Sequence, residues 1–123
     1  MKYFWDTYAL ALLLERNSQI SPYAREKGIT STLNVAELCA YLRRKGINCK
    51  DIVDRIRDAF VIVEKVPLDA AVSAAELRHE MRRRGKYWSC VDSIGYLLAE
   101  KIGAKFLTGD NEFQNVKNVE FIS

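Results

Sequence analysis

The sequence contains no run of apolar residues long enough to cross a membrane. The longest uninterrupted run, Tyr8 to Leu14, spans seven residues, whereas a membrane-spanning helix needs about 20. The run follows Asp6 and has neither a basic segment before it nor a small-residue cleavage site after it, so it does not resemble a secretory signal. We therefore expect a cytoplasmic protein that makes no contact with a membrane.

Cysteine and histidine are both scarce. The chain has three cysteines, Cys39, Cys49 and Cys90, which are odd in number and form no Cys-x-x-Cys pair. This usage favours a reducing compartment over a disulfide-stabilised secreted fold. With a single histidine, His79, the sequence offers no set of nitrogen and sulfur ligands for zinc.

The sequence also lacks a large excess of charge of either sign. Its net charge of +3 permits an anionic partner without requiring one. A chain of 123 residues with 49% hydrophobic residues fits one domain around one core. We find no repeat, linker or low-complexity tract, and we expect a single domain over residues 1–123.

Short β-prone segments alternate with helical patterns along the chain. We expect strands at 2–5, 29–32, 60–64, 105–107 and 119–122, helices at 7–16, 34–45, 50–59, 68–84 and 89–102, a connection or short helix at 17–28, and a helical turn at 111–115. This alternation predicts an α/β three-layer sandwich with a mainly parallel central sheet flanked by helices. Such sheets bind ligands outside the carboxyl ends of their strands, which directs attention to strand-terminal residues.

Four acidic residues lie at such positions. Asp6 and Asp110 follow expected strands, while Glu37 and Asp92 lie in the first turns of expected helices. Each has a purely structural explanation. The two that follow strands can be N-caps, and residues 34–37 and 89–92 both resemble capping boxes. Capping alone can therefore account for any one of the four.

The neighbours of two of these acids indicate that the side chains are enclosed. Glu37 is flanked at helical spacing by Leu33, Ala36, Ala40 and Tyr41, and Asp92 shares a helix face with Gly95, Tyr96 and Ala99. A glycine at position 95 costs about 1 kcal/mol of helix propensity, which suggests close packing at that point. We therefore expect partial burial of both carboxylates.

Carboxylates that are enclosed together repel one another. Two unit charges 4 Å apart interact by about 4 kcal/mol at an effective dielectric of ~20, so such a cluster requires protonation or a bound cation. Oxygen ligands without histidine select hard ions, Mg²⁺ or Mn²⁺. If this reading is correct, the four acids converge in one groove, the hydroxyl of Thr108 lies next to Asp6 or Ser31, and Gly109 lets the backbone turn closely past it.

Three segments, "MKYFWDTYAL", "TSTLNVAEL" and "YWSCVDSIGYLLAEKIGAKFLTGDNEF", together resemble a PIN domain of the VapC toxin type. Carried over residue by residue, the resemblance makes Asp6, Glu37, Asp92 and Asp110 the catalytic, metal-binding carboxylates. It also makes Thr7, Ser31 and Thr108 supporting hydroxyls near the site. Glu112 lies where some relatives have a further acid or amide, and we expect it to act as a dipole partner in the first turn of a helix.

The resemblance implies a Mg²⁺- or Mn²⁺-dependent endoribonuclease. In that family the carboxylates hold one or two ions, and a metal-activated water attacks an RNA phosphodiester in line, leaving a 5′-phosphate and a 3′-hydroxyl. The resemblance further implies a homodimer and an antitoxin partner, whose segment covers the acidic groove and places an arginine among the carboxylates.

Basic residues gather at the ends of two expected helices. They can be favoured there by the helix dipole, or they can contact RNA phosphates, and both readings remain open for Arg43, Arg44, Arg82, Arg83 and Lys86. Tyr87 and Trp88 lie beside the second cluster. They can stack on a base, although a place in the core or on a dimer surface is the favoured interpretation.

Two other functions are compatible with an α/β domain of this kind. The first is a non-catalytic module that binds RNA or protein, and the presence of all four acids makes it the less favoured reading. The second is a phosphoacceptor signalling domain, which needs adjacent acids after its first strand and a lysine after a late strand. Here Asp6 stands alone after Trp5, and Gly109-Asp110 occupies the place of the lysine.

Overall fold

The computed structural model describes residues 2–123. Its centre is a five-stranded sheet in the order β3-β2-β1-β4-β5, and every neighbouring pair of strands is parallel. The predicted mainly parallel sheet is thus confirmed. The strands are β1 (Tyr3–Trp5), β2 (Gly28–Ser31), β3 (Phe60–Val63), β4 (Lys105–Thr108) and β5 (Val119–Phe121).

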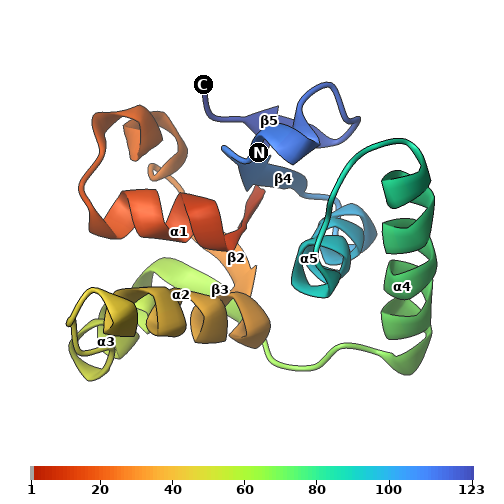
Figure 1. The fold of residues 1–123 in the computed structure, drawn as a ribbon. Coiled ribbons are helices and arrows are strands. Elements are labelled where there is room, and N and C mark those ends of the chain that lie inside the picture. Colours follow the sequence, from red (N-terminus) through yellow and green to blue (C-terminus); the bar gives the residue numbers. More distant parts are fainter. Residues whose placement is uncertain (1) are drawn as a thin grey trace.

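Helices cover both faces of this sheet, which gives the three layers that the sequence predicts (Figure 1). On one side lie α1 (Thr7–Leu14), α2 (Thr32–Arg44) and α3 (Lys50–Ala59), and on the other lie α4 (Leu68–Arg83) and α5 (Cys90–Lys101). Two 3₁₀ helices, η1 (Ser18–Tyr23) and η2 (Asn111–Phe113), complete the fold.

Alternation along the strands builds a separate core on each face. Trp5 and Leu107 point into a cluster with α1, α2 and α3, whereas their neighbours Phe4 and Phe106 point into a cluster with α4 and α5. Successive side chains of a strand face opposite sides of the sheet, so β1 and β4 supply both cores. The four side chains are at most 1% exposed, which fixes the register of the two central strands.

Helix α5 lies close to the sheet because Gly95 has no side chain. A Cβ at this position would lie 3.0 Å from Cε1 of Phe4 and 3.1 Å from Cε1 of Phe106. The close packing that the sequence suggests is therefore present. It brings the first turn of α5, with Asp92, towards the ends of β1 and β4.

Two α-helix boundaries differ from the sequence prediction by two residues, and the remaining α-helix boundaries agree within one residue. Helix α2 begins at Thr32 rather than at residue 34, because the side chain of Ser31 caps it by accepting the amide hydrogen of Asn34 at 3.3 Å. Glu37 consequently lies in the second turn, not in the first. Helix α1 ends at Leu14 rather than at Arg16, whose φ of 55° lies in the left-handed region and does not continue a right-handed helix.

Across residues 2–123, none of the helices combines the length and the apolar character that a membrane span requires.

Candidate active site

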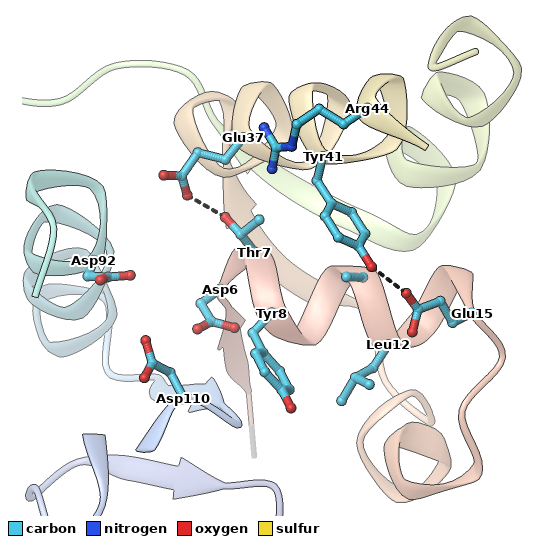
Figure 2. Close-up of a pocket in the computed structure, with 11 residues that line it drawn as sticks. Asp6, Thr7, Tyr8, Leu12, Glu15, Glu37, Tyr41, Arg44, Asp92 and Asp110 are labelled. Atoms are coloured by element: carbon cyan, nitrogen blue, oxygen red, sulfur yellow. Dashed lines mark hydrogen bonds between the residues drawn. The ribbon is translucent and has the colours of Figure 1, made fainter. Parts of the chain in front are cut away.

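A pocket of about 480 Å³ opens at the carboxyl ends of β1 and β4 (Figure 2). The chain places β2 on one side of β1 and β4 on the other, and α/β sheets bind ligands at such a switch point. All four predicted acids line this pocket. Its lining consists of Asp6, Thr7, Tyr8, Ala11, Leu12, Glu15, Glu37, Tyr41, Arg44, Asp92 and Asp110.

Asp6 lies directly after β1 and caps α1. Its Oδ1 accepts the amide hydrogen of Ala9 at 2.8 Å, and the residue is only 4% exposed. Burial is the main reason that the pKa of Asp6 is raised to about 7, and the charges of Asp92 and Asp110 raise it further, while hydrogen bonds from Thr108 and Ala9 lower it. The carboxyl group of Asp6 therefore titrates near neutral pH.

Asp110 lies just after β4 and caps η2. Its Oδ1 accepts the amide hydrogen of Glu112 at 3.0 Å. The buried hydroxyl of Thr108 accepts the amide hydrogen of Asp110 at 3.0 Å and is also hydrogen-bonded to Asp6. Thr108 thus lies next to Asp6, as the sequence predicts, and links the two acids that follow the central strands.

Gly109, between Thr108 and Asp110, makes a close contact with Tyr8. A Cβ at position 109 would lie 2.4 Å from Cε1 and 2.9 Å from Cδ1 of the Tyr8 ring. The backbone of Gly109 is not left-handed, because the glycines with positive φ are Gly46, Gly85 and Gly103. The expected close approach is present, but the ring of Tyr8 requires the glycine here, not an unusual backbone conformation.

Asp92 enters the pocket from the first turn of α5. The predicted capping box is confirmed: Oγ of Ser89 accepts the amide hydrogen of Asp92 at 3.0 Å, and Oδ2 of Asp92 accepts that of Ser89 at 2.9 Å. Burial raises the pKa of Asp92, and the charges of Asp110 and Glu37 raise it further, against the opposing effect of the Ser89 hydrogen bonds. The acids of the pocket therefore interact electrostatically.

Glu37 is half-buried and is held by a chain of directed hydrogen bonds. The hydroxyl of Thr7 donates to Oε1 of Glu37 at 2.6 Å. The side-chain amide Nδ2 of Asn34 donates to the hydroxyl of Thr7 at 3.3 Å, and the hydroxyl of Ser31 donates to Oδ1 of Asn34 at 2.6 Å. Because the hydroxyl of Thr7 accepts from Asn34, its own hydrogen is directed to Glu37. This series of hydrogen bonds therefore orients the carboxylate of Glu37.

The predicted capping box at residues 34–37 is wrong. The cap of α2 is Ser31, and Asn34 is a buried residue of the first turn that is 2% exposed. Its side chain supports Thr7 rather than the start of the helix. The residue types that cap helices also suit buried hydrogen-bond networks. Tertiary packing decides which of the two roles a given residue takes.

Capping and clustering are not alternatives for these acids. Asp6, Asp92 and Asp110 each use one carboxylate oxygen for a cap, and a carboxylate offers about four acceptor sites on its two oxygens. Over residues 2–123, however, no three acidic, histidine or cysteine side chains stand close enough together to hold a metal ion as they are oriented. A shared ion would therefore require rotation of some of these side chains.

Arg44 is the one predicted RNA contact that lines the pocket of acids. Arg82 lies over the ring of Tyr87 at 5.5 Å, Arg83 pairs with Glu80 at 3.3 Å, and the ammonium of Lys86 donates to the Gln114 carbonyl at 3.1 Å. Arg43 is exposed and is absent from the lining of the pocket.

The aromatic pair beside the second basic cluster has two different environments. Trp88 is 2% exposed, stacks on Phe113 with ring centroids 4.2 Å apart, and donates to the carbonyl oxygen of Glu112 at 2.8 Å. It is a core residue, whereas Tyr87 is 63% exposed. Glu112 lies in η2, as expected for a first-turn acid, and its Oε2 accepts the amide hydrogen of Tyr87 at 3.0 Å.

Sequence reasoning missed several residues of the site, among them Tyr8 and Asn34. Tyr8 belongs to the apolar run of α1, yet it is 49% exposed and lines the pocket. Its position two residues after Asp6 was the available signal, because the first turn of a helix that starts at a site faces that site. The signal for Asn34 was its position one turn before Glu37 on the same helix.

Comparisons with known proteins identify the family. No curated protein matches the sequence. In fold, the chain is similar to a toxin–antitoxin complex from Klebsiella pneumoniae (15% identity, TM-score 0.79, 98% of both chains). It is also similar to the sarcin-ricin loop cleaving toxin VapC20 of Mycobacterium tuberculosis (21% identity, TM-score 0.76, covering 98% of this chain and 99% of that one). A third similar structure is VapBC2 from Rickettsia felis bound to a promoter DNA fragment (16% identity, TM-score 0.74, covering 98% of this chain and 97% of that one). The pattern of the PIN domain family matches residues 4–119. The chain belongs to the PIN domain family.

Proposed function

We propose that this protein is a Mg²⁺- or Mn²⁺-dependent endoribonuclease and the toxin of a toxin–antitoxin pair. One observation carries the proposal. Asp6, Asp92, Asp110 and Glu37 line one pocket at the switch point of the sheet, where burial and neighbouring charges raise the pKa of Asp6 to about 7. Clustered acids with a perturbed pKa in a cleft are typical of functional sites.

The donor set fits a hard divalent cation. The four acids provide only oxygen ligands, which Mg²⁺ and Mn²⁺ prefer, and Asp6, Asp92 and Asp110 would hold the ion with Glu37 beside them. When bound, such an ion supplies a nucleophilic water at neutral pH and neutralises charge at the phosphate. Burial is the main cause of the raised pKa values of Asp6 and Asp92, and the ion would also offset the repulsion between carboxylates that adds to it.

Other residues of the chain have supporting roles in this proposal. Thr7 orients the carboxylate of Glu37 through its 2.6 Å hydrogen bond. Thr108 holds the carboxyl of Asp6 in place from the end of β4. Arg44, the cation in the lining of the pocket, would bind a phosphate of the substrate strand.

Similar structures support the choice of RNA as substrate and of an antitoxin as partner. One of them is described as a toxin that cleaves the sarcin-ricin loop, and another as a toxin–antitoxin complex. The pocket extends over Ala11 and Leu12 of α1, which would accept apolar side chains of an antitoxin segment. A homodimer, which the family resemblance implies, is part of the same proposal.

The decisive experiment is incubation of the purified protein with mixed RNA. We expect cleavage with Mg²⁺ or Mn²⁺ and none after addition of EDTA. Asp92→Asn should lose cleavage, whereas Asp51→Asn should retain it, because Asp51 also lies in the first turn of a helix but is exposed on α3 and outside the pocket.

Two results would contradict the proposal. Cleavage that persists in EDTA would exclude a metal-dependent reaction. Binding of RNA or of an antitoxin by a wild-type protein that cleaves no RNA with either ion would favour the alternative, a non-catalytic binding module of the same fold.

A further inference from the structure

Tyr8 differs from the other tyrosines of the chain. Of the six tyrosines, five have a partner for the ring or the hydroxyl, namely Tyr3, Tyr23, Tyr41, Tyr87 and Tyr96. Within residues 2–123, Tyr8 has no stacking ring, no cation over its ring and no hydrogen bond for its hydroxyl. Its aromatic surface is therefore available to a ligand.

The position of this ring is fixed by the backbone beside it. The ring lies against Gly109, where a Cβ would come within 2.4 Å of Cε1. Tyr8 is 49% exposed and lines the same pocket as Asp6 and Asp110 (Figure 2). A flat aromatic surface thus stands next to the acid cluster, and the chain omits a side chain at position 109 that would displace it.

The chemistry of the pocket restricts what can use this surface. The ring carries no charge and shares its pocket with carboxylates, so it does not attract a phosphate. It suits a flat, uncharged, polarisable group, and every nucleobase of a single strand presents such a face to an aromatic side chain. Arg44, on the α2 side of the same pocket, would hold the backbone of that strand.

We propose that Tyr8 stacks on an unpaired base of the RNA strand that passes the acid cluster, and that Gly109 is small so that the ring can occupy this place. The inference rests on the proposed function and adds to it that the substrate is single-stranded at the site. Tyr8 is then a substrate-positioning residue, which contacts a base and takes no part in bond cleavage.

Binding of a fluorescein-labelled single-stranded oligoribonucleotide tests this without cleavage. We expect fluorescence anisotropy in Ca²⁺, which also takes oxygen ligands, to show that Tyr8→Ala raises the Kd about tenfold. Tyr8→Phe and Tyr8→Trp should keep wild-type affinity, whereas Tyr8→Leu, of similar bulk but not aromatic, should behave like the alanine variant. Leu68→Ala removes an exposed apolar side chain outside the pocket and should change nothing.

A set of oligonucleotides with a single abasic site at successive positions identifies the contact as a base. At one position the wild-type affinity should fall to the level of Tyr8→Ala, and that variant should lose nothing more. A fully paired duplex should bind wild type and Tyr8→Ala equally.

The inference is overturned if wild type and Tyr8→Ala bind the single strand equally, if wild type does not bind it, or if no abasic position removes the difference between them. A Tyr8 effect seen only with an antitoxin segment would overturn it as well. Cleavage assays with Mg²⁺ keep the two hypotheses apart. Tyr8-dependent binding without cleavage would refute the nuclease and retain the stacking role. Cleavage with the same KM in wild type and Tyr8→Ala would refute the stacking role and retain the nuclease.

Discussion

At the scale of single residues, the caps and the acid cluster use different oxygens of the same carboxylates. A cap needs one acceptor and makes no demand on charge, since asparagine caps a helix about as well as aspartate does. A divalent cation needs the negative charge as well. Exchange of aspartate for asparagine therefore separates the two roles.

Asp110→Asn is the sharpest of these exchanges. The variant should retain the cap of η2 and keep its free energy of unfolding within about 0.5 kcal/mol of wild type, while RNA cleavage falls at least about 100-fold. Thermal melts with and without Mg²⁺, beside a cleavage assay, measure both effects. Asp110→Ala should show the same loss of cleavage and a further loss of about 1 kcal/mol of stability. If Asp110→Asn cleaves RNA at the wild-type rate, Asp110 acts only as a cap.

Asp6 predicts a dependence of stability on pH in metal-free protein. Its pKa rises from 3.8 to about 7 on folding, chiefly through burial, so between these values the folded state binds more protons than the unfolded state. The contribution of Asp6 to stability is therefore complete below about pH 4 and is lost as pH rises through 7. Between pH 5 and pH 8, wild type should lose about 3 kcal/mol relative to Asp6→Asn. Urea unfolding of both proteins in EDTA at pH 5 and pH 8 measures this difference, and a constant difference would contradict the prediction.

At the scale of elements, the sequence predicted the sheet and the convergence of the acids for the same reason. Strands that alternate with helices form parallel sheets, and parallel strands gather their carboxyl ends at one edge. The residues after β1 and β4 must then meet. The start of α2 could not be predicted in this way, because Ser31, Thr32 and Asn34 are all residue types that favour an N-cap. Only the folded structure shows that the side chain of Ser31 makes the capping hydrogen bond, whereas that of Asn34 donates to Thr7.

The exposure of Tyr8 likewise could not be predicted from the pattern of apolar residues in α1. Tyr8 begins an apolar run whose second and third members, Ala9 and Leu10, are buried in α1. The pattern predicts a buried aromatic residue equally well. The ring lies against Gly109, which follows β4 about 100 residues further along the chain, and the local pattern contains no sign of this contact.

The packing of α5 gives a prediction for Gly95. Alanine there should gain about 1 kcal/mol of helix propensity, but its Cβ would press on the buried rings of Phe4 and Phe106, and overpacking typically costs 1–3 kcal/mol. We expect a net loss of stability of about 1 kcal/mol, with a shift of Asp92 that also slows cleavage. Chemical unfolding measures the first effect, and a stabilised Gly95→Ala would show that α5 has room to adjust.

At the scale of the whole molecule, the net charge of +3 hides an uneven distribution. The pocket has five acids in its lining, Asp6, Glu15, Glu37, Asp92 and Asp110, against one cation, Arg44. The remaining basic residues lie elsewhere, with several at the end of α4. Electrostatic attraction of RNA therefore depends on where the strand lies, not on total charge.

Arg44 and its neighbour Arg43 form a matched pair for testing this distribution. Arg44→Ala should weaken binding of a single-stranded oligoribonucleotide and reduce the slope of log K against log salt by about 0.7. Arg43→Ala removes the same charge from the same helix but outside the pocket, and should leave the slope unchanged. Anisotropy titrations at several salt concentrations measure both slopes. Equal effects of the two substitutions would indicate a diffuse field rather than a contact at the pocket.

The contact between the Tyr8 ring and Gly109 makes these two positions epistatic. Gly109→Ala alone should displace the ring and lower stability, whereas the same substitution in a Tyr8→Ala background should be nearly neutral, and a double-mutant cycle of unfolding free energies should give a coupling of about 1 kcal/mol. Additive effects would show that the ring moves aside without cost. Where the coupling holds, substitution at one position decides which residues the other can accept. A lineage of this protein can then lose the glycine only after it has given up the ring.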